Sequence, residues 1–284
     1  MSLALVYLAR GVGGGLASVK CFFDAYNEYT PDCPHDLIVI AKGWESPNER
    51  NELQALAQEN KATIYDLPDD GLDWAAYMRL APQLKHEWLC FLNTHSRPRV
   101  KGWLRLLKAV ADSHTDNFGA VGATGSWETL LPNVFARSKN YKGIQGIVTY
   151  PVRVILNAFR YVANIRDISG FPNPHLRSNA FLVKREMFVE YCLTQKIPQC
   201  KRDTTMFESG RKSFSAYLLA RGLKVLVTGV DGNVYDPEQW INSGTFRIPE
   251  QHNLLVSDNQ TNDYQASAVH RKVNLEIMTW GQSF

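Results

Sequence analysis

The 284-residue sequence contains few cysteines, and their arrangement indicates no structural role. Five are present, at Cys21, Cys33, Cys90, Cys192 and Cys200, with long spacings and no C-x-x-C pair. An odd number at such spacings argues against a disulfide framework and against a zinc site. We therefore expect reduced thiols in a cytoplasmic protein.

Long apolar runs are also missing. No stretch of about 18 uncharged apolar residues occurs, so no transmembrane helix is expected. The nearest is 144–165, IQGIVTYPVRVILNAFRYVANI, which Arg153 and Arg160 interrupt. As a helix this segment would be basic and amphipathic, which predicts either peripheral contact with an anionic membrane or packing against the sheet or a partner. The apolar start of the chain is too short for a signal segment and predicts a first β-strand.

A strong charge of one sign is lacking as well. The net charge of +3 and the pI of about 8.5 are too mild for a nucleic-acid-binding protein, so no nucleic-acid partner is expected. Hydrophobic residues make up 45% of the chain, which is ordinary globular usage. The absence of internal repeats and of composition breaks predicts a single domain over residues 1–284. Nothing in the sequence indicates an oligomeric state.

Strand-like and helix-like segments alternate over the first 125 residues. The expected strands cover 3–9, 36–42, 62–67, 87–92 and 118–123. The expected helices cover 16–29, 48–60, 74–84 and 103–111. Uninterrupted apolar strands joined by helices predict a mostly parallel sheet with both faces covered, an α/β fold. Ligands of such sheets bind beyond the carboxyl ends of the strands.

The second half of the chain is less regular. A strand is expected at 179–183, a helix at 211–221 and a strand at 224–228. The last 55 residues are polar and rich in turn-forming residues, and no element is predicted there.

The first candidate ligand segment is the glycine-rich turn 10–15. Its backbone N–H groups can approach a phosphate, which makes Arg10 and Gly11 candidate nucleotide contacts. The dinucleotide fingerprint requires a third glycine where Leu16 stands, and the second strand ends in Lys42 rather than in an acidic residue. A dehydrogenase is therefore disfavoured, and neither NAD nor haem is expected. A structural turn is the alternative for this segment.

The second candidate is a group of four carboxylates, Asp66, Asp69, Asp70 and Asp73, at the mouth of the predicted sheet. Carboxylates accept hydrogen bonds from nucleobases and ribose hydroxyls, and they bind divalent cations. Crowded like charges cost free energy unless a ligand or cation offsets them. For Asp73 alone, the alternative is capping of the next helix.

Four segments carry a resemblance to a known family. They read TIYDLPDDGLDWAAY, FLNTHSRPRVKGWLRLL, SNAFLVKREMF and FESGRKSFSAYLLARGLKVLV. In order and spacing over about residues 1–230, they resemble family 2 glycosyltransferases of the GT-A (Rossmann-like) fold. The resemblance implies a nucleotide-binding half at about 1–125 and an acceptor-side half at about 126–284. It further implies transfer of a sugar from a nucleotide-sugar donor to a hydroxyl of a glycan or lipid-linked acceptor, in surface polysaccharide or glycan assembly.

The chain departs from this family at the metal site. Asn93 and His95 stand where the family has the two aspartates of its Asp-x-Asp motif. They remain candidate ligands of a donor-dependent Mn²⁺ or Mg²⁺, although Mg²⁺ prefers carboxylates and water. The alternative is that cationic side chains neutralise the leaving diphosphate; the candidates are Arg10, Lys42, Arg97 and Arg177. A catalytically silent domain that binds nucleotide or glycan is the alternative function.

The resemblance also implies a catalytic base. Glu208 occupies the family's position for it, and Asp203 is the fallback in the same predicted loop. An inverting transfer needs a carboxylate that takes the proton of the acceptor hydroxyl. The alternative is that Glu208 caps the helix expected at 211–221 or pairs with Arg211 or Lys212.

Overall fold

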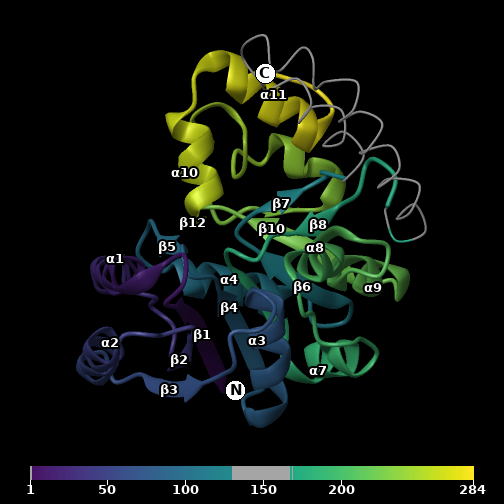
Figure 1. The fold of residues 1–284 in the computed structure, drawn as a ribbon. Helices are drawn as coiled ribbons and strands as arrows, with labels where there is room; N and C mark the ends of the chain where they lie inside the picture. The colour runs from purple at the N-terminus through teal and green to yellow at the C-terminus, as the bar shows by residue number, and fades with distance from the viewer. Residues whose placement is uncertain (1, 130–166, 168) are drawn as a thin grey trace, which may run out of the picture.

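The computed structural model describes residues 2–129, 167 and 169–284 (Figure 1). The segment 144–165, for which membrane contact or packing is predicted, lies outside these residues. Within the described part of the chain, no helix is long and apolar enough to cross a membrane.

The described residues form one main sheet of eight strands, in the order β11–β10–β6–β9–β4–β1–β2–β3. The strands are β1 (Leu3–Arg10), β2 (Asp36–Lys42), β3 (Thr63–Asp66), β4 (Trp88–Leu92), β6 (Phe118–Gly122), β9 (Phe181–Lys184), β10 (Lys224–Thr228) and β11 (Val234–Tyr235). All run in one direction except β9 and β11. The predicted α/β class with a mostly parallel sheet is confirmed.

Helices cover both faces of this sheet (Figure 1). One face carries α1 (Gly15–Glu28), α2 (Pro47–Glu59) and α4 (Trp103–Ser113), and the other carries α3 (Asp73–Leu80), α7 (Arg185–Leu193), α8 (Lys201–Ser209) and α9 (Phe214–Ala220). Successive side chains of a strand point to opposite faces, and in β1 both sets are apolar. The strand is therefore buried on both sides.

Two short sheets accompany the main sheet. In one, β5 (Arg97–Pro98) pairs with β12 (Val256–Ser257) and so attaches the C-terminal segment, and in the other β7 (Gly125–Ser126) pairs with β8 (His175–Leu176). Immediately after β12 the chain enters α10 (Asn259–Ala266) and then α11 (Val269–Trp280). Both helices lie above the edge where the parallel strands end (Figure 1).

Two expectations for the second half are corrected. The helix predicted at 211–221 begins at Phe214, because the Ser213 side chain accepts a hydrogen bond from the Ala216 N–H and caps it. Residues predicted as a loop around Glu208 form α8, whose buried Phe207 packs against the rings of Trp74 and Tyr191. α8 is a strongly polar helix in which only Thr204 and Phe207 are buried, which explains why the sequence pattern does not reveal it.

Candidate active site

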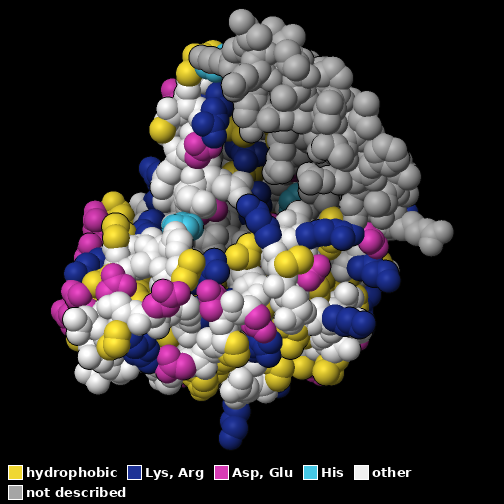
Figure 2. Space-filling model, in the orientation of Figure 1, with side chains coloured by type: hydrophobic (Ala, Val, Ile, Leu, Met, Phe, Trp, Pro, Cys, Tyr) yellow, Lys and Arg dark blue, Asp and Glu magenta, His cyan; other side chains and the backbone are white. Residues whose placement is uncertain are grey.

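A cleft of about 970 Å³ lies between the carboxyl ends of β1 and β4 and the C-terminal helices. Figure 2 shows the molecule hollowed here, with Lys and Arg side chains beside the opening. Its walls come from the loop after β1, the start of α3, the loop after β4, one face of α8, and α10 with α11. This is the edge at which α/β sheets bind ligands.

The cleft brings together some of the residues predicted from the sequence. The predicted residues that line it are Arg10, Asp73, Asn93, His95, Arg177 and Glu208. They come from five separate segments of the chain, with Asn93 and His95 in the same loop, so only the fold places them around one space.

The other predicted site residues do not line the cleft. Asp66 forms an ion pair with Arg50, and Asp70 forms one with Arg79. Gly11 packs so closely on the backbone of Gly43 that a Cβ atom would lie 2.3 Å from the carbonyl oxygen.

Arg97 and Asp203 also make local contacts instead of reaching the cleft. Arg97 donates hydrogen bonds to the carbonyl groups of Thr94 and Ser96. Asp203, in the first turn of α8, accepts a hydrogen bond from the Gln199 N–H at 3.0 Å, which lowers the pKa of its carboxyl group.

Lys42 stabilises the loop formed by residues 69–72. Its buried ammonium group donates to the carbonyl oxygens of Asp70, Gly71 and Leu72 at 2.8, 2.8 and 3.1 Å. It also lies 3.5 Å from Asp69, which accepts a hydrogen bond from Arg10 at 2.8 Å. The cation holds together the loop that precedes α3, so it is not positioned as a phosphate ligand.

We expect Lys42→Met to lower the free energy of unfolding by about 3 kcal/mol, because it leaves three part-buried carbonyl groups without their donor and removes one of the two cations that contact Asp69. Urea unfolding followed by circular dichroism measures this. The control is Lys20→Met, which removes an exposed ion pair with Glu52 and should change stability by less than about 1 kcal/mol. An unchanged unfolding midpoint with lost nucleotide binding would instead make Lys42 a ligand-binding cation.

The loop after β4 uses Asn93 for its own structure. The Asn93 Oδ1 atom accepts hydrogen bonds from the His95 N–H at 2.9 Å and from the Ser96 hydroxyl at 3.1 Å. Burial lowers the pKa of His95, and the neighbouring Arg97 lowers it further, so the imidazole is neutral at pH 7. Among the described residues there is no group of three or more His, Cys, Asp and Glu side chains able to hold a metal ion. The described residues therefore do not fit a metal bound by the protein alone.

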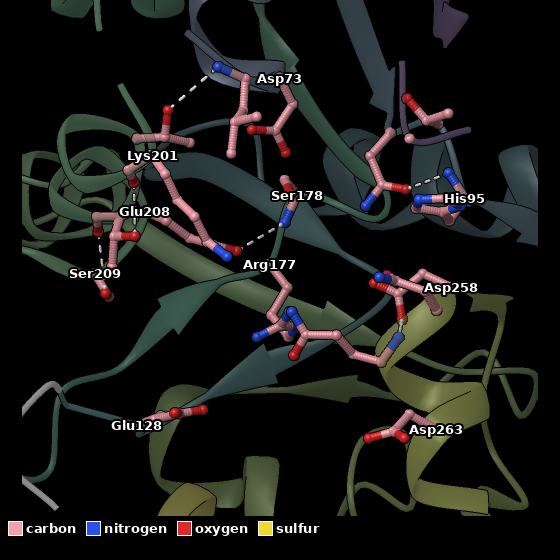
Figure 3. A pocket seen from close by; sticks show the side chains of 18 of the residues that line it. Asp73, His95, Glu128, Arg177, Ser178, Lys201, Glu208, Ser209, Asp258 and Asp263 are labelled. Atoms are coloured by element: carbon pink, nitrogen blue, oxygen red, sulfur yellow. Dashed lines mark hydrogen bonds between the residues drawn. The ribbon is translucent and has the colours of Figure 1, made fainter. Parts of the chain in front are cut away.

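Asp73 and Glu208 form a pair of carboxylates in the cleft (Figure 3). Burial raises the pKa of Asp73, and the charge of Glu208 raises it further. Burial also raises the pKa of Glu208, while Arg177 partly offsets the rise. The Ser178 N–H donates to Glu208 Oε1 at 3.4 Å. A carboxylate with a raised pKa, open to a polar cleft, has the properties of a general base.

Glu208 belongs to a polar stripe of α8 that the sequence analysis does not identify. The stripe consists of Lys201, Thr204, Thr205, Glu208 and Ser209. The spacing of three, four and seven residues puts these side chains on one helix face. The recurrence of polar residues at helical spacing is the sequence signal that could have identified this helix face.

The sequence analysis also misses the contribution of the C-terminal segment. Asp258 is buried at the cleft and caps α10, accepting hydrogen bonds from the N–H groups of Gln260 and Thr261. Buried Arg247 pairs with Glu128 at 3.0 Å. The Asp-x-x-Thr pattern at 258–261 is a capping signal from which the start of α10 could have been predicted. By contrast, the pairing of residues 119 positions apart leaves no local signal.

No known family and no curated protein matches this sequence. Solved structures match by fold. TarS of S. aureus in complex with UDP-GlcNAc has 12% identity and a TM-score of 0.34, with 43% of this chain and 33% of that one covered, so the match spans about a third of TarS. The galactosyltransferase LgtC, in complex with donor and acceptor sugar analogs, has 10% identity and a TM-score of 0.49, with 98% and 96% covered.

A CMP:2-keto-3-deoxy-manno-octonic acid synthetase complexed with CTP also matches, with 9% identity, a TM-score of 0.43, and 80% and 89% covered. At such identities and at TM-scores below 0.5, none of these similarities identifies a substrate or a reaction for this chain.

Proposed function

We propose that this chain is a single-domain glycosyltransferase that moves a sugar from a nucleotide-sugar donor to a hydroxyl group of an acceptor. The observation that carries the proposal is the pair of carboxylates with raised pKa, Asp73 and Glu208, in a cleft of about 970 Å³ at the carboxyl ends of the parallel strands. The volume suits a nucleotide-sugar, since ligand pockets commonly measure about 300–1,000 Å³. The sequence resemblance to GT-A glycosyltransferases supports the same class.

In this proposal the nucleoside lies against the glycine-rich turn and the start of α3. Val12, Gly13, Gly14 and Leu72 line the cleft there. The sugar then lies toward the carboxylate pair, and the acceptor enters beside α10 and α11. Glu208 takes the proton of the acceptor hydroxyl as that oxygen attacks the sugar.

The proposal is tested with a panel of nucleotide-sugars in a thermal-shift assay, followed by donor hydrolysis and transfer to glycan acceptors. A donor present at 100 times its dissociation constant should stabilise the protein by about 2.7 kcal/mol. Release of nucleoside diphosphate from that donor would support the enzyme. Binding without any turnover would identify the chain as a silent nucleotide-binding domain, and binding of no donor at all would overturn the proposal.

A further inference from the structure

Arg177 is a buried cation without a hydrogen-bond acceptor among the side chains that the structure describes. Its side chain is 6% exposed, and it makes no hydrogen bond and no ion pair with any described residue. Its Nε atom is fully buried and unpartnered. Burying a charge costs several kcal/mol unless hydrogen bonds and an opposite charge offset it. The charge of Glu208 interacts with Arg177, but no described side chain accepts a hydrogen bond from the guanidinium. The side chain lines the cleft, so an anionic ligand there can supply the missing partner.

The structure holds this guanidinium in place next to the carboxylate pair. Its Cζ atom lies 4.6 Å from the centre of the Phe246 ring, and its backbone N–H donates to the Thr124 carbonyl at 3.2 Å. The next residue, Ser178, donates to Glu208. Figure 3 shows Arg177 between Glu208 and Asp258. The Phe246 ring and the Thr124 carbonyl therefore position the cation beside the proposed reaction centre.

Most other cations of the cleft already have partners. Of the Lys and Arg side chains among the described lining residues, Arg10 pairs with Asp69, Arg247 with Glu128, and Arg271 with Asp263. Lys201, at the start of α8, is exposed and forms no ion pair with another described residue. Among the described lining residues, Arg177 is thus the buried Lys or Arg side chain without an ion pair, and it is available to a ligand.

We propose that Arg177 binds the diphosphate of the donor and takes the place that a divalent cation occupies in the resembling family. This inference rests on the proposed function. In the transfer step, the acceptor oxygen forms a bond to the anomeric carbon and its proton passes to Glu208. The bond between that carbon and the phosphate oxygen breaks, and its electron pair stays on the phosphate. The departing nucleoside diphosphate gains negative charge, which the guanidinium offsets through charge-assisted hydrogen bonds.

The experiment is isothermal titration calorimetry with UDP, GDP, CDP and ADP, each in excess EDTA and again with Mn²⁺. We expect at least one of them to bind in EDTA, and Arg177→Gln to weaken that binding by about 10- to 100-fold. Arg177→Lys keeps the charge but not the planar donor pair, so an intermediate loss is expected. The control is Arg221→Gln, which breaks an exposed ion pair with Glu190 outside the cleft and should leave binding unchanged.

Thermal unfolding of the ligand-free variants separates a binding role from a structural one. Removing an unpartnered buried charge should leave Arg177→Gln at least as stable as the parent, whereas a structural arginine would lose stability on replacement. Binding that requires Mn²⁺ and is insensitive to Arg177→Gln would overturn this inference and leave the proposed function standing. Failure of every nucleoside diphosphate and nucleotide-sugar to bind, with or without Mn²⁺, would overturn both.

Discussion

Glu208→Gln is expected to lower kcat for sugar transfer by about 10²–10⁴-fold, the usual contribution of a general base. The amide keeps the shape of the side chain but cannot accept the proton of the acceptor hydroxyl. Donor binding should persist, because the substitution removes a negative charge next to the site proposed for the diphosphate. Steady-state kinetics, together with titration of the nucleoside diphosphate, measure the two effects separately.

The pH dependence gives an independent test of the same residue. Burial raises the pKa of Glu208, and the base must be deprotonated to act. Activity should therefore fall as the pH drops through a pKa above the usual range of glutamate, and this acid limb should disappear in Glu208→Gln. Because burial disfavours the charged carboxylate of Glu208, the free energy of unfolding should fall as the pH rises through the folded-state pKa of this group. The Gln variant should consequently be as stable as the parent, or more so, at pH 7–8.

Asp203→Asn is the matched comparison, since Asp203 lies on the same helix but outside the cleft. It should retain the parent rate. A parent-like rate for Glu208→Gln would remove Glu208 as the base, and Asp73, its partner in the pair, would then be the next residue to replace by Asn.

Asn179→Ala is expected to lower the free energy of unfolding by about 2–4 kcal/mol, because it leaves two buried groups without partners. Asn179 is 1% exposed. Its Oδ1 atom accepts a hydrogen bond from the Thr124 hydroxyl at 2.6 Å, and its Nδ2 atom donates to the Val256 carbonyl at 2.8 Å. The side chain thus ties β12, and with it the C-terminal wall of the cleft, to the edge of the main sheet.

Urea unfolding measures the loss, and nucleotide titration should show weaker binding in the same variant because the wall that carries Asp258 loses a tether. The control is Asn60→Ala, which removes one hydrogen bond to the Leu56 carbonyl at the end of α2 and should cost less than about 1 kcal/mol. A loss below 1 kcal/mol for Asn179→Ala would show that the β5–β12 pairing holds the wall by itself.

The sequence by itself determined the α/β class and the position of most elements in the first half. Strand β2 has the predicted bounds, and β1 extends one residue beyond them. These strands are continuous apolar runs between polar turns, so local pattern is sufficient to find them. The rule that ligands bind beyond the carboxyl ends of such strands was also enough to bring Arg10, Asp73, Asn93 and His95 into consideration.

Only the tertiary structure decided which candidates share a cleft. Of the four clustered aspartates, Asp73 alone lines it, because ion pairs with Arg10, Arg50 and Arg79 hold the other three elsewhere. The sequence also does not predict that β9 lies antiparallel between β4 and β6, since the direction of a strand is set by its pairing and not by its composition. The wall formed by residues after Val256 depends on a pairing with Pro98. Contacts between residues so far apart in the sequence are determined by packing and hydrogen bonding in the folded chain, and local sequence periodicity does not predict them.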